Sequence, residues 1–298
     1  MKKTLTVFTP AYNRAHIIGR TYESLCRQTC KDFEWLVIDD GSSDNTRDLV
    51  TGWIKEEKIP IRYIYQENQG MHGAHNTAYK NITTELNTCI DSDDWMPDDA
   101  VEIIVNFWQE YGSKDVAGII GLDVVAGGTI IGTAFEKSAQ LKHSSDPSIK
   151  GDKKLVIRSE LTSRYPEYPI FPGERYVGLG YKYQLIDQDY MWLTLNEPLV
   201  VVEYQEDGSS YNMYRQWWKN PQGFAFIHNN DLKYINSPKR RLQVAIHYVS
   251  HCIRAKSICK IFKSNAPILT TCCIPLGVCL YILTAYKVWK GSQMKQIK

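Results

Sequence analysis

The stretch CIDSDDWMPDDA, residues 89–100, places three aspartates within four positions directly after a short apolar run. Neighbouring carboxylates repel one another and raise one another's pKa, so such a cluster is costly unless something neutralises it. The apolar run, residues 88–90, predicts the end of a buried strand, and Pro97 at a first helical position predicts a helix after the cluster. The stretch therefore predicts a strand, an acidic turn and a helix in direct succession.

The same alternation precedes this stretch three times. Apolar runs predict strands, and apolar residues at helical spacing predict helices. The expected strands are residues 5–8, 33–38 and 61–65, and the expected helices are residues 17–28, 49–54 and 74–80. Short buried strands alternating with helices are typical of an α/β fold, so we expect a mainly parallel sheet flanked by helices.

Ligands of such sheets bind beyond the carboxyl ends of the strands. Three expected strands end in residues that could share one crevice. These residues are Pro10, Ala11 and Tyr12 after the first strand, Asp39 and Asp40 after the second, and Asp91, Ser92 and Asp93 after the fourth. The acidic cluster is therefore not expected to act alone.

The remainder of the chain is less regular. We expect strands at residues 116–120 and 199–203, a polar loop over 137–154, and helices beyond residue 211. The expected division is an α/β domain over residues 1–210, with halves 1–110 and 111–210, and a helical C-terminal extension over residues 211–298.

The formal net charge of +2 hides a strong asymmetry. Residues 238–298 contain eleven Lys and Arg and no Asp or Glu, so the first 237 residues hold 24 Lys and Arg against 33 Asp and Glu, a net charge of −9. A basic tail on an acidic body predicts an anionic partner, such as a membrane surface, nucleic acid or a phosphate-bearing substrate. Its lysines alternate with apolar runs and no nucleic-acid-binding motif is present, so nucleic acid is not expected.

Within this tail, residues 264–286 contain no charged side chain, and 23 residues are long enough to span a bilayer. Pro267, Pro275 and Gly277 interrupt the apolar run, and lysines flank both of its ends, which opposes a plain span. We expect the segment to dip into or lie on the cytosolic leaflet, where each basic residue adds about 1 kcal/mol. The alternative is a buried helical hairpin packed on the α/β domain.

Carboxylates crowded at a strand end, without a His or Cys pattern beside them, suit a hard cation such as Mg²⁺ or Mn²⁺ shared with substrate phosphates. Alternatively, the aspartates cap the helix that follows them.

The sequence has neither a G-x-G-x-x-G after the first strand nor a P-loop, which argues against nicotinamide enzymes and P-loop ATPases. The eight cysteines form no CxxC pair and no signal peptide precedes Leu5, so we expect a cytoplasmic location.

Four motifs together resemble those of the inverting glycosyltransferases of family 2, whose nucleotide-sugar fold is called GT-A. They are TVFTPAYNR (6–14), DFEWLVIDDGSSDNT (32–46), NQGMHGAHN (68–76) and CIDSDDWMPDDA (89–100). Beyond residue 110 the match is looser. FPGERYVG (171–178) and NEPLVVVEYQEDGSS (196–210) are similar to segments of family members that build bacterial surface polysaccharides.

The resemblance implies a nucleoside pocket lined by Pro10, Ala11 and Tyr12, with Asp40 receiving the base and ribose and Asp39 behind it. It also implies that Asp91 and Asp93, with Ser92 between them, form the D-x-D pair of the family. Asp93 would face the Mg²⁺ or Mn²⁺ that bridges the two phosphates, and Asp94 would lie behind it.

In the third motif, the resemblance implies that Asn68 and Asn76 help to close a loop over the donor. His75 stands where many relatives have arginine. An imidazole titrates near neutrality, so we expect either no diphosphate contact at His75 or a contact that depends on pH near 7.

An inverting enzyme needs a general base on the acceptor side. In many relatives an acidic residue opens a helix about five turns before an Asn-Glu-Pro stretch, but this chain has glycines 178 and 180 there. The remaining candidates are Glu174, which we prefer, and Asp187 and Asp189. A structural ion pair between Glu174 and Arg175, or solvated aspartates, is the alternative for each.

The resemblance therefore implies an enzyme that moves a sugar from a nucleoside diphosphate to a hydroxyl of a glycan or lipid-linked acceptor, with inversion. It would act in bacterial cell-surface polysaccharide synthesis, in the cytoplasm and peripherally at an anionic inner membrane. One alternative is a nucleotidyltransferase of similar fold, although a Pro-Ala-Tyr-Asn sequence stands where that class has a glycine-rich basic loop. Another is a non-catalytic, membrane-docked nucleotide-sugar-binding module that lacks the base.

Overall fold

The computed structural model describes the backbone of residues 3–203 and 213–296, and the chain forms two compact units. The expected boundary between residues 210 and 211 lies outside the described residues. The first unit is made of the described residues within 1–168 and 182–205, and the second of those within 169–181 and 206–298. Residues 169–181 thus belong with the C-terminal helices.

The first unit is built on one eight-stranded sheet with the strand order β3-β2-β1-β4-β7-β5-β8-β6. The strands are β1 (Leu5–Ala11), β2 (Phe33–Asp39), β3 (Ile61–Tyr65), β4 (Leu86–Cys89), β5 (Val116–Val125), β6 (Leu141–Lys142), β7 (Lys153–Arg158) and β8 (Met191–Val202). Strands β3, β2, β1 and β4 are parallel neighbours, as are β5 and β8, whereas β7 and β6 run antiparallel to their neighbours. The predicted α/β fold with a mainly parallel sheet is confirmed.

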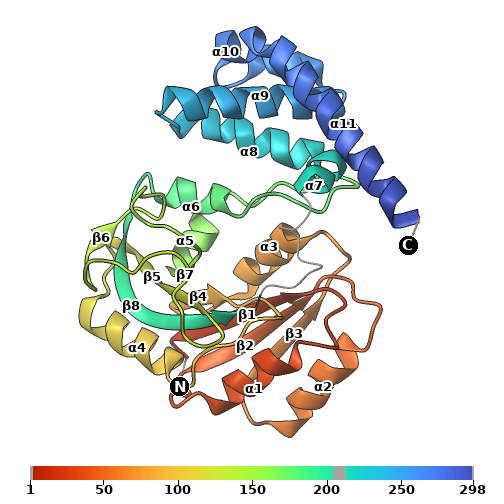
Figure 1. Ribbon diagram of the computed structural model, residues 1–298. Coiled ribbons are helices and arrows are strands. Elements are labelled where there is room, and N and C mark those ends of the chain that lie inside the picture. Colours follow the sequence, from red (N-terminus) through yellow and green to blue (C-terminus); the bar gives the residue numbers. More distant parts are fainter. Residues whose placement is uncertain (1–2, 204–212, 297–298) are drawn as a thin grey trace. The chain divides into compact units, whose positions relative to one another are not determined.

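Helices cover both faces of this sheet. They are α1 (Gly19–Arg27), α2 (Thr46–Glu56), α3 (Met71–Asn81), α4 (Ala100–Tyr111), α5 (Ser159–Arg164) and α6 (Gly180–Ile186). Helices α1, α2 and α4 lie on one face and α3 and α5 on the other (Figure 1). Tyr22 and Leu25 of α1 and Ile104 of α4 join Trp35 and Val37 of β2 in one buried apolar cluster, which explains why these helices lie flat on the strands.

The strand register brings the carboxyl ends of the parallel strands to one edge. Ala11 pairs with Asp39, Asp39 with Tyr65, and Phe8 with Cys89. The turns that follow β1, β2 and β4 therefore begin at the same edge of the sheet, as the sequence predicts.

The prediction of Pro97 at the first position of a helix is wrong, because α4 begins at Ala100. The reason is tertiary. Gln28 of α1 donates a hydrogen bond from Nε2 to the Pro97 carbonyl, and its Oε1 accepts the Val101 N–H. A glutamine from another helix thus binds the first turn of α4. The Asp99 side chain makes no cap hydrogen bond.

The expectation of a polar loop over residues 137–154 is only partly correct. This segment contains β6 and the first two residues of β7, the strand inserted antiparallel between β4 and β5. Two consecutive lysines begin β7, and their charge conceals the strand from a reading of apolar runs.

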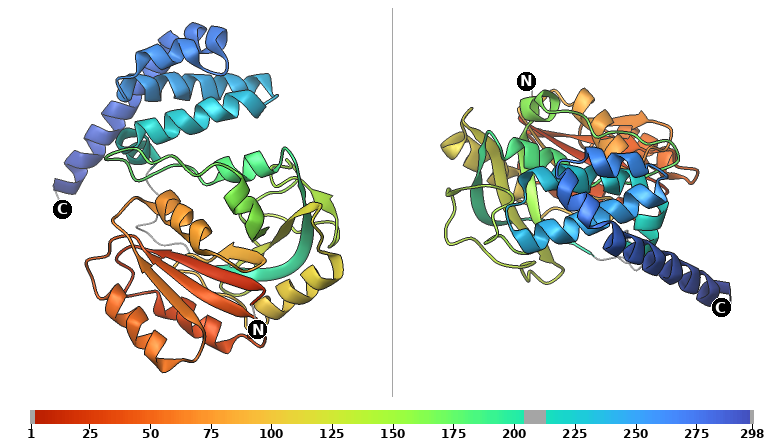
Figure 2. Two further views of the ribbon diagram at one scale, coloured as in Figure 1. Left: turned by 180° about the vertical axis from the view of Figure 1, so that it is seen from behind. Right: turned by 90° about the horizontal axis from the view of Figure 1, so that it is seen from above.

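The second unit contains the predicted helical C-terminal extension. Its helices are α7 (Met213–Lys219), α8 (Pro221–Tyr234), α9 (Pro238–Arg254), the 3₁₀ helix η2 (Ile258–Lys263), α10 (Pro267–Cys272) and α11 (Ile274–Gln296). Helices α8 and α9 pack side by side (Figure 2), and Leu232, Tyr248 and Val249 lie in their shared apolar core. Across the described residues, none of the helices combines the length and the apolar character needed to cross a membrane.

Candidate functional site

The acidic turn after β4 exposes alternate side chains. Asp91 and Asp93 are partly exposed, whereas Ser92 and Asp94 are buried. Helix α1 fixes this arrangement, because the Thr21 hydroxyl donates a 2.8 Å hydrogen bond to the Asp94 carbonyl. With its backbone held there, the turn presents two carboxylates outward.

Asp94 is held from a second direction by the end of β8. Its Oδ1 accepts a hydrogen bond of 3.2 Å from the Glu203 N–H, directly after the last residue of that strand. Burial is the main cause that raises the pKa of Asp94 to about 8; Lys154 works to lower this pKa, and Asp91, Asp93 and Asp123 work to raise it. Asp94 is therefore a buried residue that holds the turn in place, and the negative charge of its neighbours favours its protonated form.

Two residues that the sequence did not indicate complete the cluster. Lys154 of β7 donates a hydrogen bond of 3.0 Å from Nζ to the Cys89 carbonyl. Burial works to lower the pKa of Lys154, but Asp123, Asp91 and Asp94 outweigh this effect and raise the pKa. Asp123 of β5 is buried, and its Oδ1 has no hydrogen-bond partner among the described residues. No spacing in the sequence links these residues, because the insertion of β7 beside β4 brings them together.

The charges and donor atoms of this cluster fit a hard divalent cation. The carboxyl groups of Asp91, Asp93 and Asp123 act on that of Asp94, and the ammonium group of Lys154 lies among them. Oxygen donors with a surplus of negative charge are the ligand set of Mg²⁺ and Mn²⁺. The alternative that the aspartates cap α4 has no support in the hydrogen bonds of that helix.

The turn after β2 is ordered by Asp39. Its carboxylate accepts the Ser42 N–H at 2.8 Å and the Tyr63 hydroxyl at 2.5 Å. Gly41 in this turn has φ +84°, and a Cβ there would lie 2.9 Å from the Asn68 nitrogen. Only glycine meets both demands, so the turn can close against the loop that carries Asn68.

Asp40 binds the same loop. Its two oxygens accept hydrogen bonds of 2.7–2.8 Å from the Gln66 side chain and from the backbone N–H groups of Gln69 and Gly70. The carboxylate is buried, and in this structure it orders residues 66–70. Its predicted contact with the base and ribose stays a prediction.

The end of β1 lies beside this turn. The Ala11 carbonyl accepts the Asp40 N–H at 2.8 Å, which joins the two strand ends. Pro10 and Ala11 are largely covered, whereas the Tyr12 side chain is 50% exposed. Tyr12 is therefore not a core residue, and its ring face is accessible for stacking on a planar ligand.

His75 and Asn76 of α3 point into the interior of the first unit. The His75 ring is fully buried, contacts Phe8 edge-on, and its Nδ1 lies 3.1 Å from the Tyr79 hydroxyl. Burial lowers the pKa of His75 to about 3, so the expectation of titration near neutrality is wrong. Asn76 makes two hydrogen bonds, of 2.8 and 2.9 Å, with the backbone of Tyr168.

Two of the candidate bases lie at the far end of β8 from the acidic cluster. Asp187 and Asp189 precede the first residue of β8, whereas Asp94 contacts the residue after its last. Neither aspartate is among the groups whose charges act on Asp94 or on Lys154. Asp187 is buried and accepts hydrogen bonds from Ser144, Ser145 and Trp192, and Asp189 accepts one from the Tyr165 hydroxyl. The structure does not bring either aspartate to the cluster.

The third candidate, Glu174, lies in the second unit. Its two carboxylate oxygens accept the N–H groups of Gln222 and Gly223 at 2.9 Å each, in the first turn of α8. Asn220 precedes that helix and binds the Arg175 N–H through Oδ1. Glu174 thus binds the positive end of a helix dipole, where a carboxylate is stabilising.

Comparison with known proteins shows what the N-terminal part of the chain is similar to. Residues 6–135 match the model of glycosyl transferase family 2. An uncharacterized glycosyltransferase of Nostoc sp. is 30% identical over 155 residues, which are 51% of this chain and 45% of that protein. The chain thus spans less than half the length of this relative.

Two solved structures share the GT-A fold with this chain. The first 349 residues of S. aureus TarS, in complex with UDP-GlcNAc, align with a TM-score of 0.59 and 18% identity over 87% of this chain and 75% of that one. The mannosyltransferase PcManGT of Pyrobaculum calidifontis, in complex with GDP-Man and Mn²⁺, aligns with a TM-score of 0.57 and 18% identity over 100% of this chain and 86% of that one.

Proposed function

We propose that this chain, which belongs to glycosyltransferase family 2, transfers a sugar from a nucleoside diphosphate to an acceptor hydroxyl with inversion. The observation that carries the proposal is the acidic cluster, which lies at the same edge of the sheet as the turns that carry Tyr12 and Asp40. The complexes of TarS with UDP-GlcNAc and of PcManGT with GDP-Man support a nucleotide-sugar donor for this fold.

In this proposal Asp91 and Asp93 hold Mg²⁺ or Mn²⁺. The cation, when bound, neutralises the charge that develops on the leaving diphosphate. Asp94 and Lys154 orient the acidic turn from behind, through the hydrogen bonds to Glu203 and to the Cys89 carbonyl. Tyr12 stacks on the base. Asp40 orders residues 66–70, and this loop, which includes Asn68, closes beside the donor.

A screen of nucleotide sugars tests the proposal. We expect one of them to release its nucleoside diphosphate in the presence of Mn²⁺ and not in EDTA, because the leaving group needs the cation. Release of pyrophosphate from a nucleoside triphosphate and a sugar phosphate would identify a nucleotidyltransferase instead. Donor binding without turnover on any glycan or lipid-linked acceptor would identify a binding module.

The substitution Glu174→Gln distinguishes a general base from a helix cap. Loss of a base lowers kcat by about 10²–10⁴-fold at unchanged donor affinity. Loss of a charge that accepts two backbone N–H groups instead lowers stability by about 1–3 kcal/mol. Because both oxygens already accept N–H groups of α8, we expect the fall in thermal stability and a change in kcat below tenfold. Asp187→Asn and Asp189→Asn, assayed in parallel, test the other two candidates.

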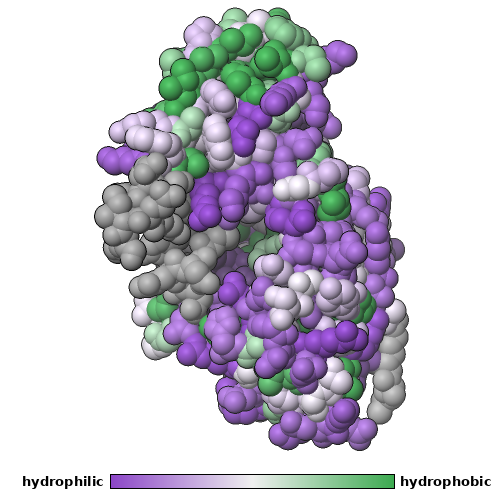
Figure 3. All heavy atoms as spheres, turned by 90° about the vertical axis from the view of Figure 1, so that its right-hand side faces the viewer, coloured by the Kyte–Doolittle hydropathy of each residue, from purple (hydrophilic) through white to green (hydrophobic). Residues whose placement is uncertain are grey.

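We further propose that the second unit binds an anionic membrane surface, where a lipid-linked glycan acceptor of bacterial surface polysaccharide would be presented. Exposed apolar side chains gather on this unit, at the top of Figure 3. They include Ile258, Phe262, Ile268, Leu276, Ile282, Tyr286 and Trp289. The exposed lysines 256, 260, 263, 287 and 290 lie in the same segments, and the chain has no acidic residue from 238 onward. Apolar residues beside unopposed basic ones are typical of interfacial membrane binding.

Vesicle sedimentation checks this second proposal. We expect the chain to bind vesicles that contain phosphatidylglycerol, with weaker binding to phosphatidylcholine alone or at high salt. The double substitution Ile268→Asp and Ile282→Asp places charge within the apolar surface and should reduce binding at least tenfold. Leu141→Asp, at an exposed apolar position of the first unit, is the control. Equal binding by both variants would contradict the proposal.

A further inference from the structure

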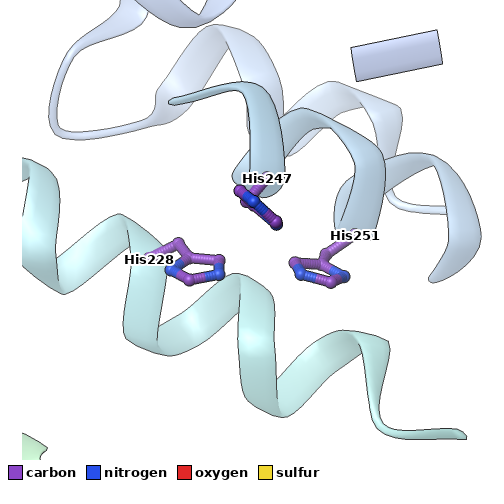
Figure 4. A group of neighbouring side chains, drawn as sticks. All are labelled: His228, His247 and His251. Atoms are coloured by element: carbon purple, nitrogen blue, oxygen red, sulfur yellow. The ribbon is translucent and has the colours of Figure 1, made fainter. Parts of the chain in front are cut away.

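Three histidines lie close together between helices α8 and α9 of the second unit. His228 projects from α8, and His247 and His251 project from α9, one helical turn apart on the same face. One ring nitrogen of each lies within 4.8 Å of those of the other two. In Figure 4 the His228 and His251 rings lie edge to edge, and the His247 ring lies over the space between them.

Four of the six ring nitrogens lack a hydrogen-bond partner among the described residues. Both nitrogens of His228, Nδ1 of His247 and Nε2 of His251 are buried without a hydrogen-bond partner in the described part of the chain. Each buried polar atom without a partner costs about 1–3 kcal/mol in typical proteins, so a group of four at one place is unusual. The pattern indicates a site for a species that accepts several imidazole lone pairs at once.

The rings of His247 and His251 are also held in the protonation state that a metal requires. Burial, together with His228 nearby, lowers the pKa of His247 to about 4. Burial also lowers the pKa of His251 well below its ordinary value, and both other histidines add to this effect. Near neutral pH these two rings are therefore uncharged and have a lone pair available.

Aromatic packing accounts for the ring faces but not for the ring edges. Phe224 stacks on His251 with centroids 5.3 Å apart, and Trp217 meets His247 at 4.7 Å. These contacts fix the orientation of the rings. They do not supply hydrogen-bond partners for the ring nitrogens, because those atoms lie at the ring edges. One nitrogen of each ring lies near one nitrogen of each of the other two.

We propose that His228, His247 and His251 bind one borderline-soft divalent metal ion, with Zn²⁺ as the ion that fits best. Imidazole nitrogens suit Zn²⁺, whereas the oxygen ligands of the acidic cluster suit Mg²⁺ or Mn²⁺, so the two sites are chemically distinct. This site lies wholly within the second unit and does not depend on the proposed transferase activity.

The geometry needs a small adjustment on binding. Zn–N bonds of about 2.0–2.1 Å in a tetrahedral site place ligand nitrogens about 3.3 Å apart. The nitrogens, at most 4.8 Å apart, would have to approach by about 1.5 Å or less, which small side-chain rotations supply.

Asp231, one turn after His228, has Oδ2 3.7 Å from His228 Nδ1. It is placed to orient that ring through an indirect contact, as carboxylates behind metal-bound histidines do. The bound ion would join α8 to α9.

The test uses the full chain, stripped of metal and kept in excess Mg²⁺ so that the acidic cluster does not bind the probe. We expect one equivalent of Zn²⁺ per chain and a rise of Tm with Zn²⁺. Co²⁺ as a probe should give the strong visible absorption of a tetrahedral site. His228→Gln and His247→Gln should each weaken Zn²⁺ binding at least 100-fold, and Asp231→Asn about tenfold.

His143→Gln, which removes an exposed histidine of the first unit, is the control and should bind Zn²⁺ as the wild type does. The Zn²⁺ dependence of the wild-type Tm needs no variant, so the test does not depend on the folding of the His228 variant, whose side chain is 18% exposed in the wild type. The proposal is overturned if wild-type Tm is unchanged by Zn²⁺, or if the histidine variants keep full affinity. A thiolate charge-transfer band with Co²⁺ would also overturn it, because the ion would then be bound by cysteines.

Discussion

Asp93→Ala is expected to abolish sugar transfer and to weaken donor binding only when a divalent cation is present. Asp93 lies partly exposed in the turn after β4, beside Asp91 and in front of the buried Asp94. Loss of one of two ligands to a cation that neutralises a leaving diphosphate removes several kcal/mol of transition-state stabilisation. A loss of about 4 kcal/mol corresponds to a fall in kcat of about 10³-fold.

Donor affinity measured with and without EDTA checks this result. The wild type should bind the donor more tightly with Mn²⁺ than in EDTA, and Asp93→Ala should show the same weak binding in both. Asp99→Ala removes an exposed aspartate six positions later that makes no cap hydrogen bond, and it should behave as the wild type. If Asp93→Ala weakens donor binding equally in EDTA, then Asp93 supports the fold and does not hold a cation.

The parallel half of the sheet was predictable because its signals are local. Each buried strand is a short apolar run, and each run ends in a turn whose chemistry is visible in the sequence. Gly41 is one example, since the tight turn after β2 requires φ > 0 and space for Asn68. The common edge of the three turns then follows from the parallel arrangement alone.

The structure of the remaining half depends on long-range pairing. Strand β7 is sandwiched between β4 and β5, although β5 precedes it by almost thirty residues in the sequence. Its first residues, Lys153 and Lys154, look like part of a polar loop until the sheet is assembled. The predicted start of α4 was wrong for a similar reason. The side chain of Gln28 binds the backbone of Pro97 and Val101, which lie 69 and 73 residues later in the sequence.

Side-chain environment was the least predictable property of the site. His75 lies in the third motif of the sequence, but its full burial against Phe8 and Tyr79 is a property of the packed core. The three histidines of α8 and α9 have no motif spacing across the two helices, and only the packing of those helices brings them together. Burial of this kind depends on tertiary contacts, which single-sequence patterns do not contain.

Lys154→Met is expected to lower the stability of the metal-free protein by about 3 kcal/mol, the range found when one partner of a buried ion pair is removed. Lys154 Nζ binds the Cys89 carbonyl and lies among Asp91, Asp94 and Asp123, whose charges raise its pKa despite burial. Without the ammonium group, those carboxylates repel one another with no compensating charge. Methionine has nearly the same length, so the change removes the charge and the hydrogen bond to the Cys89 carbonyl while it keeps most of the packing.

Divalent cation should partly replace that lost charge. The Tm of Lys154→Met should therefore rise with Mn²⁺ by more than the Tm of the wild type does, and its Mn²⁺ affinity should be higher, because a positive charge no longer opposes the cation. Lys154→Arg keeps the charge and should show neither effect. Equal Mn²⁺ affinity in Lys154→Met and the wild type would mean that Lys154 acts only through its hydrogen bond to the strand end, and that the cation does not bind among these carboxylates. The cluster after β4 would then be a structural turn, and the proposed metal site would have to be abandoned together with its role in transfer.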